Sequence, residues 1–110
     1  MINKDYFRQT RILDGGMGQE LLARGMKPNS TLWSANAILD ENYHQLVLDT
    51  HIDFIKAGAE IIVTTTFATR QKRLKENNLL DKFEYLNQKA GEIAQEAKKK
   101  FPKTYVAGGI

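Results

Sequence analysis

The fold is decided by residues 60–67, which read EIIVTTTF. Most of these residues are β-branched, and after Glu60 three apolar residues follow one another without polar alternation. β-Branched residues favour strands, and a continuous apolar run is typical of a strand that is covered on both faces. Gly58 stands just before the run, where a preceding helix can end. We therefore predict a strand over residues 60–67 within a parallel sheet.

Two segments near the N-terminus show the same kind of pattern on a shorter scale. Residues 12–13 are an Ile-Leu pair that is stopped by a glycine turn beginning at Gly15, which predicts a short buried strand. Residues 17–24 carry apolar side chains at helical spacing, and Gly25 follows them at a position that commonly ends a helix. A strand followed by a short helix is therefore expected here.

A polar loop and a long helix lie between this helix and the central strand. Residues 27–37 are mostly polar around Leu32 and Trp33, so we expect a long loop anchored by a buried tryptophan. Asp40 is a suitable N-cap, and residues 43–57 keep an apolar stripe at helical spacing. The first long helix is expected there.

The C-terminal half repeats the alternation of helix and strand. Residues 70–76 can form a short helical turn, residues 81–100 place apolar side chains on one helical face, and residues 105–110 read as a third strand. Strands alternating with helices require right-handed crossovers and a parallel sheet, which excludes all-α and all-β folds. The predicted class is α/β, with an architecture that looks incomplete because the chain ends on a strand.

Composition and charge exclude several classes of function. The 110 residues carry a net charge of +3, from 16 basic and 13 acidic side chains, which is too weak and too scattered to predict nucleic-acid binding. No run reaches the roughly eighteen apolar residues that span a membrane, and no apolar signal core is present, so a cytoplasmic protein is expected. Cysteine is absent, and His44 and His51, expected on the outer surface of a helix, form no metal site by themselves.

Chemistry in a parallel α/β fold is expected beyond the C-terminal ends of the strands. Asp14, Gly15 and Gly16 stand at the first of these ends, where a carboxylate and exposed backbone amides suit the two charged groups of an amino acid. The alternative is that Asp14 caps the next helix and the glycines only make a tight turn. The third end, at Gly108-Gly109, is a further candidate.

The second strand end carries three consecutive threonines. Thr64 and Thr66 can line a polar pocket through their hydroxyl groups, although ordinary β propensity also explains them. Trp33 can anchor its loop, form a wall of the pocket, or do both.

Several separated motifs resemble the start of the homocysteine-binding domain of the homocysteine S-methyltransferase family. They are residues 12–18 (ILDGGMG), 20–21 (EL), 24–25 (RG), 32–35 (LWSA) and 54–67 (FIKAGAEIIVTTTF). The resemblance implies a (β/α)8 TIM barrel in which zinc, held by three cysteines from later strands, binds the homocysteine thiolate for attack on a methyl donor such as S-methylmethionine. Residues 1–110 would then be the N-terminal part of this barrel domain, without the zinc ligands and without catalytic residues of their own.

The resemblance also implies roles for single residues. Asp14 would contact the substrate ammonium, Gly15 and Gly16 would face its carboxylate, and Thr66, together with Thr64, would form the polar tip of the strand. Trp33 would be the aromatic residue of the preceding loop. The family often has asparagine at the position of Thr65, so that contact does not carry over.

The sequence is compatible with three hypotheses about the function. The first is a methyltransferase of which this chain is a part that is inactive alone, with homocysteine and a methyl donor as its small-molecule partners. The second is a non-catalytic module that self-associates through open sheet edges, exposing the inner faces of Ile12, Ile62 and Val106. The third is a phosphate- or nucleic-acid-binding module, which has little basic surface near the glycine turn to support it.

Overall fold

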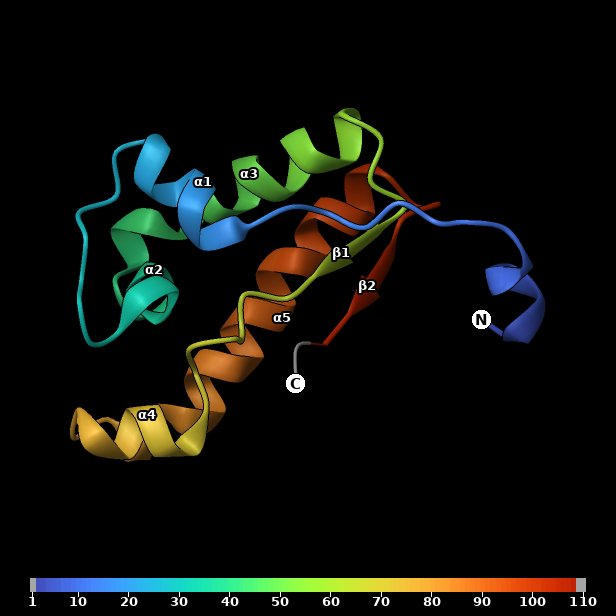
Figure 1. Cartoon of the computed structure of the whole chain (residues 1–110). Coiled ribbons are helices and arrows are strands. Elements are labelled where there is room, and N and C mark those ends of the chain that lie inside the picture. Colours follow the sequence, from blue (N-terminus) through green and yellow to red (C-terminus); the bar gives the residue numbers. More distant parts are fainter. Residues whose placement is uncertain (1, 109–110) are drawn as a thin grey trace.

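The computed structural model describes residues 2–108, in which helices pack against a small parallel sheet (Figure 1). Gly109, at the third predicted strand end, lies outside the described residues. The α-helices are α1 (Met17–Ala23), α2 (Asn36–Leu39), α3 (His44–Lys56), α4 (Gln71–Glu76) and α5 (Phe83–Lys100), and the strands are β1 (Ile61–Val63) and β2 (Tyr105–Ala107). The 3-10 turns are η1 (Lys4–Arg8), η2 (Trp33–Ala35), η3 (Glu41–Tyr43) and η4 (Leu80–Lys82).

The three predicted strands lie side by side in parallel, as expected, but each is short. β1 pairs with β2 in the register Ile62 to Val106, and Leu13 makes a single parallel bridge to Ile61 on the other side of β1. The bridge is supported by the N–H of Asp14, which donates to the carbonyl of Ile61. The first predicted strand is therefore one bridge rather than a ladder (Figure 1).

The predicted strand over residues 60–67 ends early, at Val63. The N–H of Thr64 still donates to the carbonyl of Ala107, but the N–H of Thr66 then turns back to the carbonyl of Thr64 at 2.8 Å. The chain leaves the sheet at this tight turn, so the three threonines form the loop after β1 and not its second half. This places their side chains at the C-terminal end of the sheet.

Helices α3 and α5 cover one face of the sheet. Ile62 is fully buried among Ile52 of α3 and Ala94 and Ala97 of α5, with Val106 packed against the same cluster. The prediction that Ile62 and Val106 expose an inner face is therefore wrong, because both point toward the helices. Ile12, in contrast, has 55% of its surface exposed.

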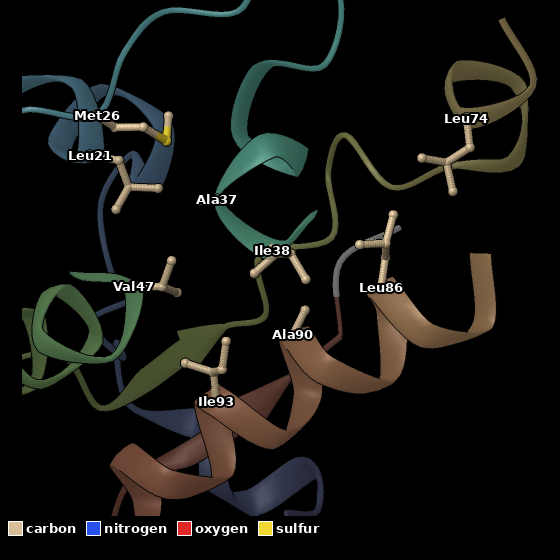
Figure 2. Close-up of a cluster of buried hydrophobic side chains, with 9 residues drawn as sticks. All are labelled: Leu21, Met26, Ala37, Ile38, Val47, Leu74, Leu86, Ala90 and Ile93. Atoms are coloured by element: carbon tan, nitrogen blue, oxygen red, sulfur yellow. The ribbon is translucent and has the colours of Figure 1, made fainter. Parts of the chain in front are cut away.

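A second apolar cluster joins the helices of both halves of the chain (Figure 2). Ile38 of α2 and Val47 of α3 are fully buried and lie close to the face of α5 that carries Ala90 and Ile93. The prediction of an irregular loop through residue 37 is thus wrong at its end. Residues from Trp33 to Leu39 form η2 and α2 because their small and apolar side chains, Ala35 and Ile38 among them, have a core to enter.

The two histidines also differ from expectation. His51 is fully buried in α3, and neither ring nitrogen has a hydrogen-bond partner among the described residues. Burial lowers the pKa of His51 to about 4, because the charged form loses its hydration. His44 is half-buried, with Nε2 lying 2.7 Å from the carbonyl oxygen of Ile38. Neither residue lies on an open outer surface, since α3 is covered by α5 and α1 as well as by the sheet.

The N-terminal turn η1 packs at the starting end of the strands (Figure 1). The ring of Tyr6 meets Tyr105 edge-on, with centroids 5.0 Å apart, and the guanidinium of Arg11 lies 3.9 Å from the centroid of Tyr6. Arg11 also forms an ion pair with Glu60, just before β1. The starting end of the sheet is therefore covered, which leaves the opposite end for a ligand.

Candidate functional site

A pocket of about 640 Å³ opens at the C-terminal end of the strands. It is built from three segments: the turn into α1, the loop that follows α1, and the loop after β1. The lining residues are Asp14, Gly15, Gly16, Met17, Gly18, Gln19, Leu22, Met26, Pro28, Asn29, Ser30, Trp33, Ser34, Val63, Thr64, Thr65 and Phe67. Asp14 is the one charged side chain among them, so the walls combine a single carboxylate with mostly apolar surface.

Asp14 is held at the pocket floor by the neighbouring strand. Its Oδ2 accepts a hydrogen bond from the N–H of Val63 at 3.0 Å, and its Oδ1 accepts none from any other described residue. Burial raises the pKa of Asp14 from its ordinary value, and the hydrogen bond from Val63 opposes that rise. The alternative of a helix cap is wrong, because α1 has Gly16 as its N-cap and no side-chain capping bond. Apart from Val63 and its own backbone amide, no described residue hydrogen-bonds the Asp14 carboxylate, which lines the pocket.

Gly15 and Gly16 have different local reasons to be glycine. A Cβ on Gly15 would lie 2.9 Å from Cε1 of Phe54, so a side chain at this position would have to displace the Phe54 ring of α3. A Cβ on Gly16 would meet nothing nearer than 3.8 Å. The N–H groups of both glycines donate to no other residue in the described part of the chain. Beside the Asp14 carboxylate, the pocket wall therefore carries two amides that have no partner within residues 2–108.

The threonines that line the pocket are not the two that the sequence predicted. Thr64 and Thr65 line the pocket, whereas Thr66 is not among its lining residues and has its Oγ1 at 3.0 Å from that of Thr64. Thr65 is 5% exposed, and its Oγ1 is buried without a hydrogen-bond partner among residues 2–108. From the sequence, Thr65 was not expected to contact the substrate. The turn that separates the three neighbours is closed by the bond from the Thr66 N–H to the Thr64 carbonyl, and three consecutive threonines give no sequence signal for it.

Trp33 lines the pocket, but it is not the buried anchor that its loop was expected to have. It is 51% exposed, while its neighbour Leu32 is 8% exposed and packs with Ala35 and Ala68. The Trp33 ring is stacked on Phe67, with centroids 6.4 Å apart and planes 24° from parallel. Phe67 is 56% exposed and was not singled out from the sequence. The two rings form an apolar wall that spans two loops.

Residues of this chain do not fit the zinc ion that the resemblance implies. The sequence has no cysteine, and residues 2–108 hold no group of three or more His, Cys, Asp or Glu side chains placed to bind a metal. His51, buried among apolar groups of α3 and its neighbours, lies outside the pocket lining. Over the same described residues, no helix is both long and apolar enough to cross a membrane.

The family model described as homocysteine S-methyltransferase matches residues 11–110, which include every residue of the pocket. The chain belongs to the homocysteine S-methyltransferase family. Sequence relatives agree with this match. Homocysteine S-methyltransferase 2 of Zea mays is 38% identical over 96 residues, covering 86% of this chain and 28% of its own length. Homocysteine S-methyltransferase 2 of Saccharomyces cerevisiae is 36% identical over 78 residues, covering 64% and 24%.

Solved structures of the family have the same arrangement of helices and strands. The metallated form of the homocysteine methyltransferase MmuM from Escherichia coli superposes with a TM-score of 0.78 at 28% sequence identity. The match covers 94% of this chain and 38% of that chain. This member of the homocysteine S-methyltransferase family therefore spans about a quarter of the length of the curated relatives cited above, and it carries the α/β units that build the Asp14 pocket.

Proposed function

We propose that this chain forms the amino-acid-binding part of a homocysteine S-methyltransferase with a TIM-barrel fold. The observation that carries the proposal is the juxtaposition of the Asp14 carboxylate with the unpaired amides of Gly15 and Gly16 in one pocket. An α-amino acid presents an ammonium and a carboxylate on one carbon atom, and these two groups match the two features of the wall. Because the chain belongs to the homocysteine S-methyltransferase family, we infer that this amino acid is homocysteine.

In this proposal each polar group of the pocket has one partner on the substrate. Asp14 Oδ1 accepts from the ammonium, and the amides of Gly15 and Gly16 donate to the carboxylate. Thr64 contributes a hydroxyl at the strand end, and Trp33 with Phe67 covers the apolar side chain of the substrate. The mostly apolar walls strengthen these charged interactions, because the attraction between opposite charges is screened less in a medium of low dielectric constant than in water.

Methyl transfer requires groups that this chain does not supply. A zinc ion would have to be held by residues beyond this sequence, and TIM barrels of this kind need about 250 residues. The proposal therefore assigns substrate binding to these residues and the activation of the thiol to the remainder of a longer barrel. The methyl donor belongs to the same proposal, with S-methylmethionine as one candidate.

The test is titration calorimetry of L-homocysteine into the wild-type chain and into Asp14→Asn. Losing a charge-assisted hydrogen bond to a charged group costs about 1.5–3 kcal/mol, so the variant should bind roughly ten- to a hundredfold more weakly. Asp49→Asn is the matched control, because Asp49 is exposed on α3 and does not line the pocket. Equal affinity of Asp14→Asn and the wild type would remove the proposed role.

A second function is favoured by one observation outside the pocket. Ile12 and Leu13 are 55% and 57% exposed, and their segment, which is bridged to β1 on one side, pairs with no strand on its other side among residues 2–108. Exposed apolar residues on an unpaired strand edge promote pairing with another chain. Self-association through this edge is the alternative function. The size of the particle in solution distinguishes the two functions.

A further inference from the structure

We propose that Arg73 is a positioning residue that fixes Trp33 as a wall of the pocket. Arg73 belongs to α4 and is not among the residues that line the pocket. It would therefore act on a ligand only through the tryptophan. The consequence for homocysteine rests on the function proposed above, whereas the contact between Arg73 and Trp33 does not.

Arg73 contacts the tryptophan loop in two ways. Its Nη1 donates a hydrogen bond to the carbonyl oxygen of Thr31 at 2.8 Å, across 42 positions of sequence. Its guanidinium carbon lies 4.7 Å from the centroid of the Trp33 ring. Both contacts come from one planar group, so the backbone and the ring of the same loop are held together against α4.

Trp33 needs support of this kind because its backbone is strained. Its φ angle is +51°, in the left-handed region that a bulky residue rarely adopts. Such a conformation persists only where surrounding contacts hold it in place. The ring itself is half exposed, and Nε1 donates to the carbonyl of Ser30 within the same loop. Contacts from outside the loop come from Arg73 and Phe67.

The second ring of the wall is held by the same part of the chain. The guanidinium of Arg70 lies 5.0 Å from the centroid of Phe67, which is stacked on Trp33. Contacts thus run from Arg73 to Trp33, from Trp33 to Phe67, and from Phe67 to Arg70. The two arginines flank the start of α4, so this short helix and its N-cap support both rings of the apolar wall.

Arginine can make both contacts that are seen at position 73, the one with the ring and the one with the Thr31 carbonyl. The guanidinium is planar, stacks on an aromatic face and donates in a fixed direction at the same time. Lysine at position 73 could still donate to Thr31, but it lacks the planar face. Methionine could still pack on the ring, but it lacks both the charge and the donors. The two substitutions therefore separate the two contacts.

Trp33 is the single tryptophan of the chain, so tryptophan fluorescence reports on this wall alone. Acrylamide quenching should increase in Arg73→Met, because methionine cannot make the hydrogen bond to Thr31 that holds the tryptophan loop, and by a smaller amount in Arg73→Lys, which can keep that bond but lacks the planar face. Lys72→Met is the matched control, because Lys72 is exposed on the same helix. Thermal melts by circular dichroism identify any variant that fails to fold. If Arg73→Met does not fold, Arg73→Lys decides the result.

The quenching and the ligand measurement answer separate questions. With L-homocysteine as the probe, Arg73→Met should bind roughly two- to fivefold more weakly than wild type, the range expected for a cation–π contact near a surface. Quenching in both Arg73 variants equal to that of Lys72→Met would overturn the contact. Wild-type affinity in a variant with altered quenching would overturn the positioning role. A wild-type chain that does not bind homocysteine contradicts the proposed function, and quenching alone then decides whether Arg73 holds Trp33.

Discussion

Asp14 and Val63 are joined by a hydrogen bond from the Val63 N–H to Oδ2 of Asp14 at 3.0 Å, across 49 positions of sequence. The bond ties the end of the first bridged segment to the end of β1. It also turns the carboxylate toward the pocket, with one oxygen occupied by the protein. Because the residue is half-buried, burial outweighs this bond and raises the pKa of Asp14. A ligand ammonium would oppose that rise by favouring the charged form.

Asp14→Asn should stabilise the chain at neutral pH while it weakens homocysteine binding. A carboxyl whose pKa is raised on folding contributes stability that is present at low pH and lost as pH rises through the folded pKa, so the ionised Asp14 costs stability at pH 7. Asparagine removes this cost and keeps an acceptor for Val63. Thermal melts should show a higher Tm for the variant at pH 7 and convergence near pH 3, with Asp49→Asn unchanged. A lower Tm at pH 7 would contradict this.

His51 should make the chain less stable in mild acid. Its pKa is about 4 in the folded chain against 6.5 ordinarily, so the unfolded chain binds the extra proton first as pH falls. The free energy of unfolding should fall between pH 6.5 and pH 4, by about 3 kcal/mol in total, from this group. Urea unfolding across that range measures the slope.

The control for this pH dependence uses both histidines. His51→Leu keeps an apolar side chain in the core and should flatten the difference between the two pH values. His44→Gln should retain the wild-type slope, because a side-chain amide can still reach the carbonyl of Ile38. A slope that survives His51→Leu would assign the acid sensitivity to the carboxylates.

Gly15→Ala should destabilise the chain more than Gly16→Ala. The new methyl would lie 2.9 Å from the Phe54 ring in the first variant and no closer than 3.8 Å to any side chain in the second. Overpacking of this kind costs about 1–3 kcal/mol, with the lower end expected where a ring can shift. Adding Phe54→Leu to Gly15→Ala should recover part of the loss in a double-mutant cycle. Additive effects of the two substitutions would show that the ring is not the cause.

The 110-residue chain should have no methyltransferase activity by itself. Incubation with zinc, homocysteine and S-methylmethionine should form no methionine above a blank, because its described residues offer no metal site. Zinc should likewise leave the Tm unchanged, since an ion that binds the folded state would raise it. Turnover above the blank would mean that a part of the barrel suffices.

Self-association should depend on the outer edge of the segment around Ile12 and Leu13, which is bridged to β1. Dynamic light scattering of the wild-type chain should give particles larger than a monomer, and Ile12→Lys should reduce their size because a charge blocks edge pairing. Leu80→Lys is the control, since Leu80 is 45% exposed but lies in η4, away from the sheet. A monodisperse wild-type monomer with a sharp, cooperative melt would exclude edge pairing.

Local sequence determined the order of the elements and the position of the candidate site. The apolar stripes of α3 and α5 and the β-branched run of β1 are patterns of neighbouring residues, and such patterns depend on helical or strand spacing alone. Asp14 and Gly15 could be placed at the ligand end because the carboxyl ends of parallel strands meet at one edge. The motifs around them were enough to indicate the family.

Tertiary structure decided what each side chain faces. His51 is buried because α1, α5 and the sheet cover α3, and Ile38 gains a helix because α5 offers it a core. The loop after β1 is tied to the end of β2 by the bond from the Thr64 N–H to the Ala107 carbonyl, and Trp33 contacts Phe67 and Arg73, which lie far along the chain. Such contacts join residues separated by tens of positions. No local periodicity encodes them, because their free energy arises only when the elements pack.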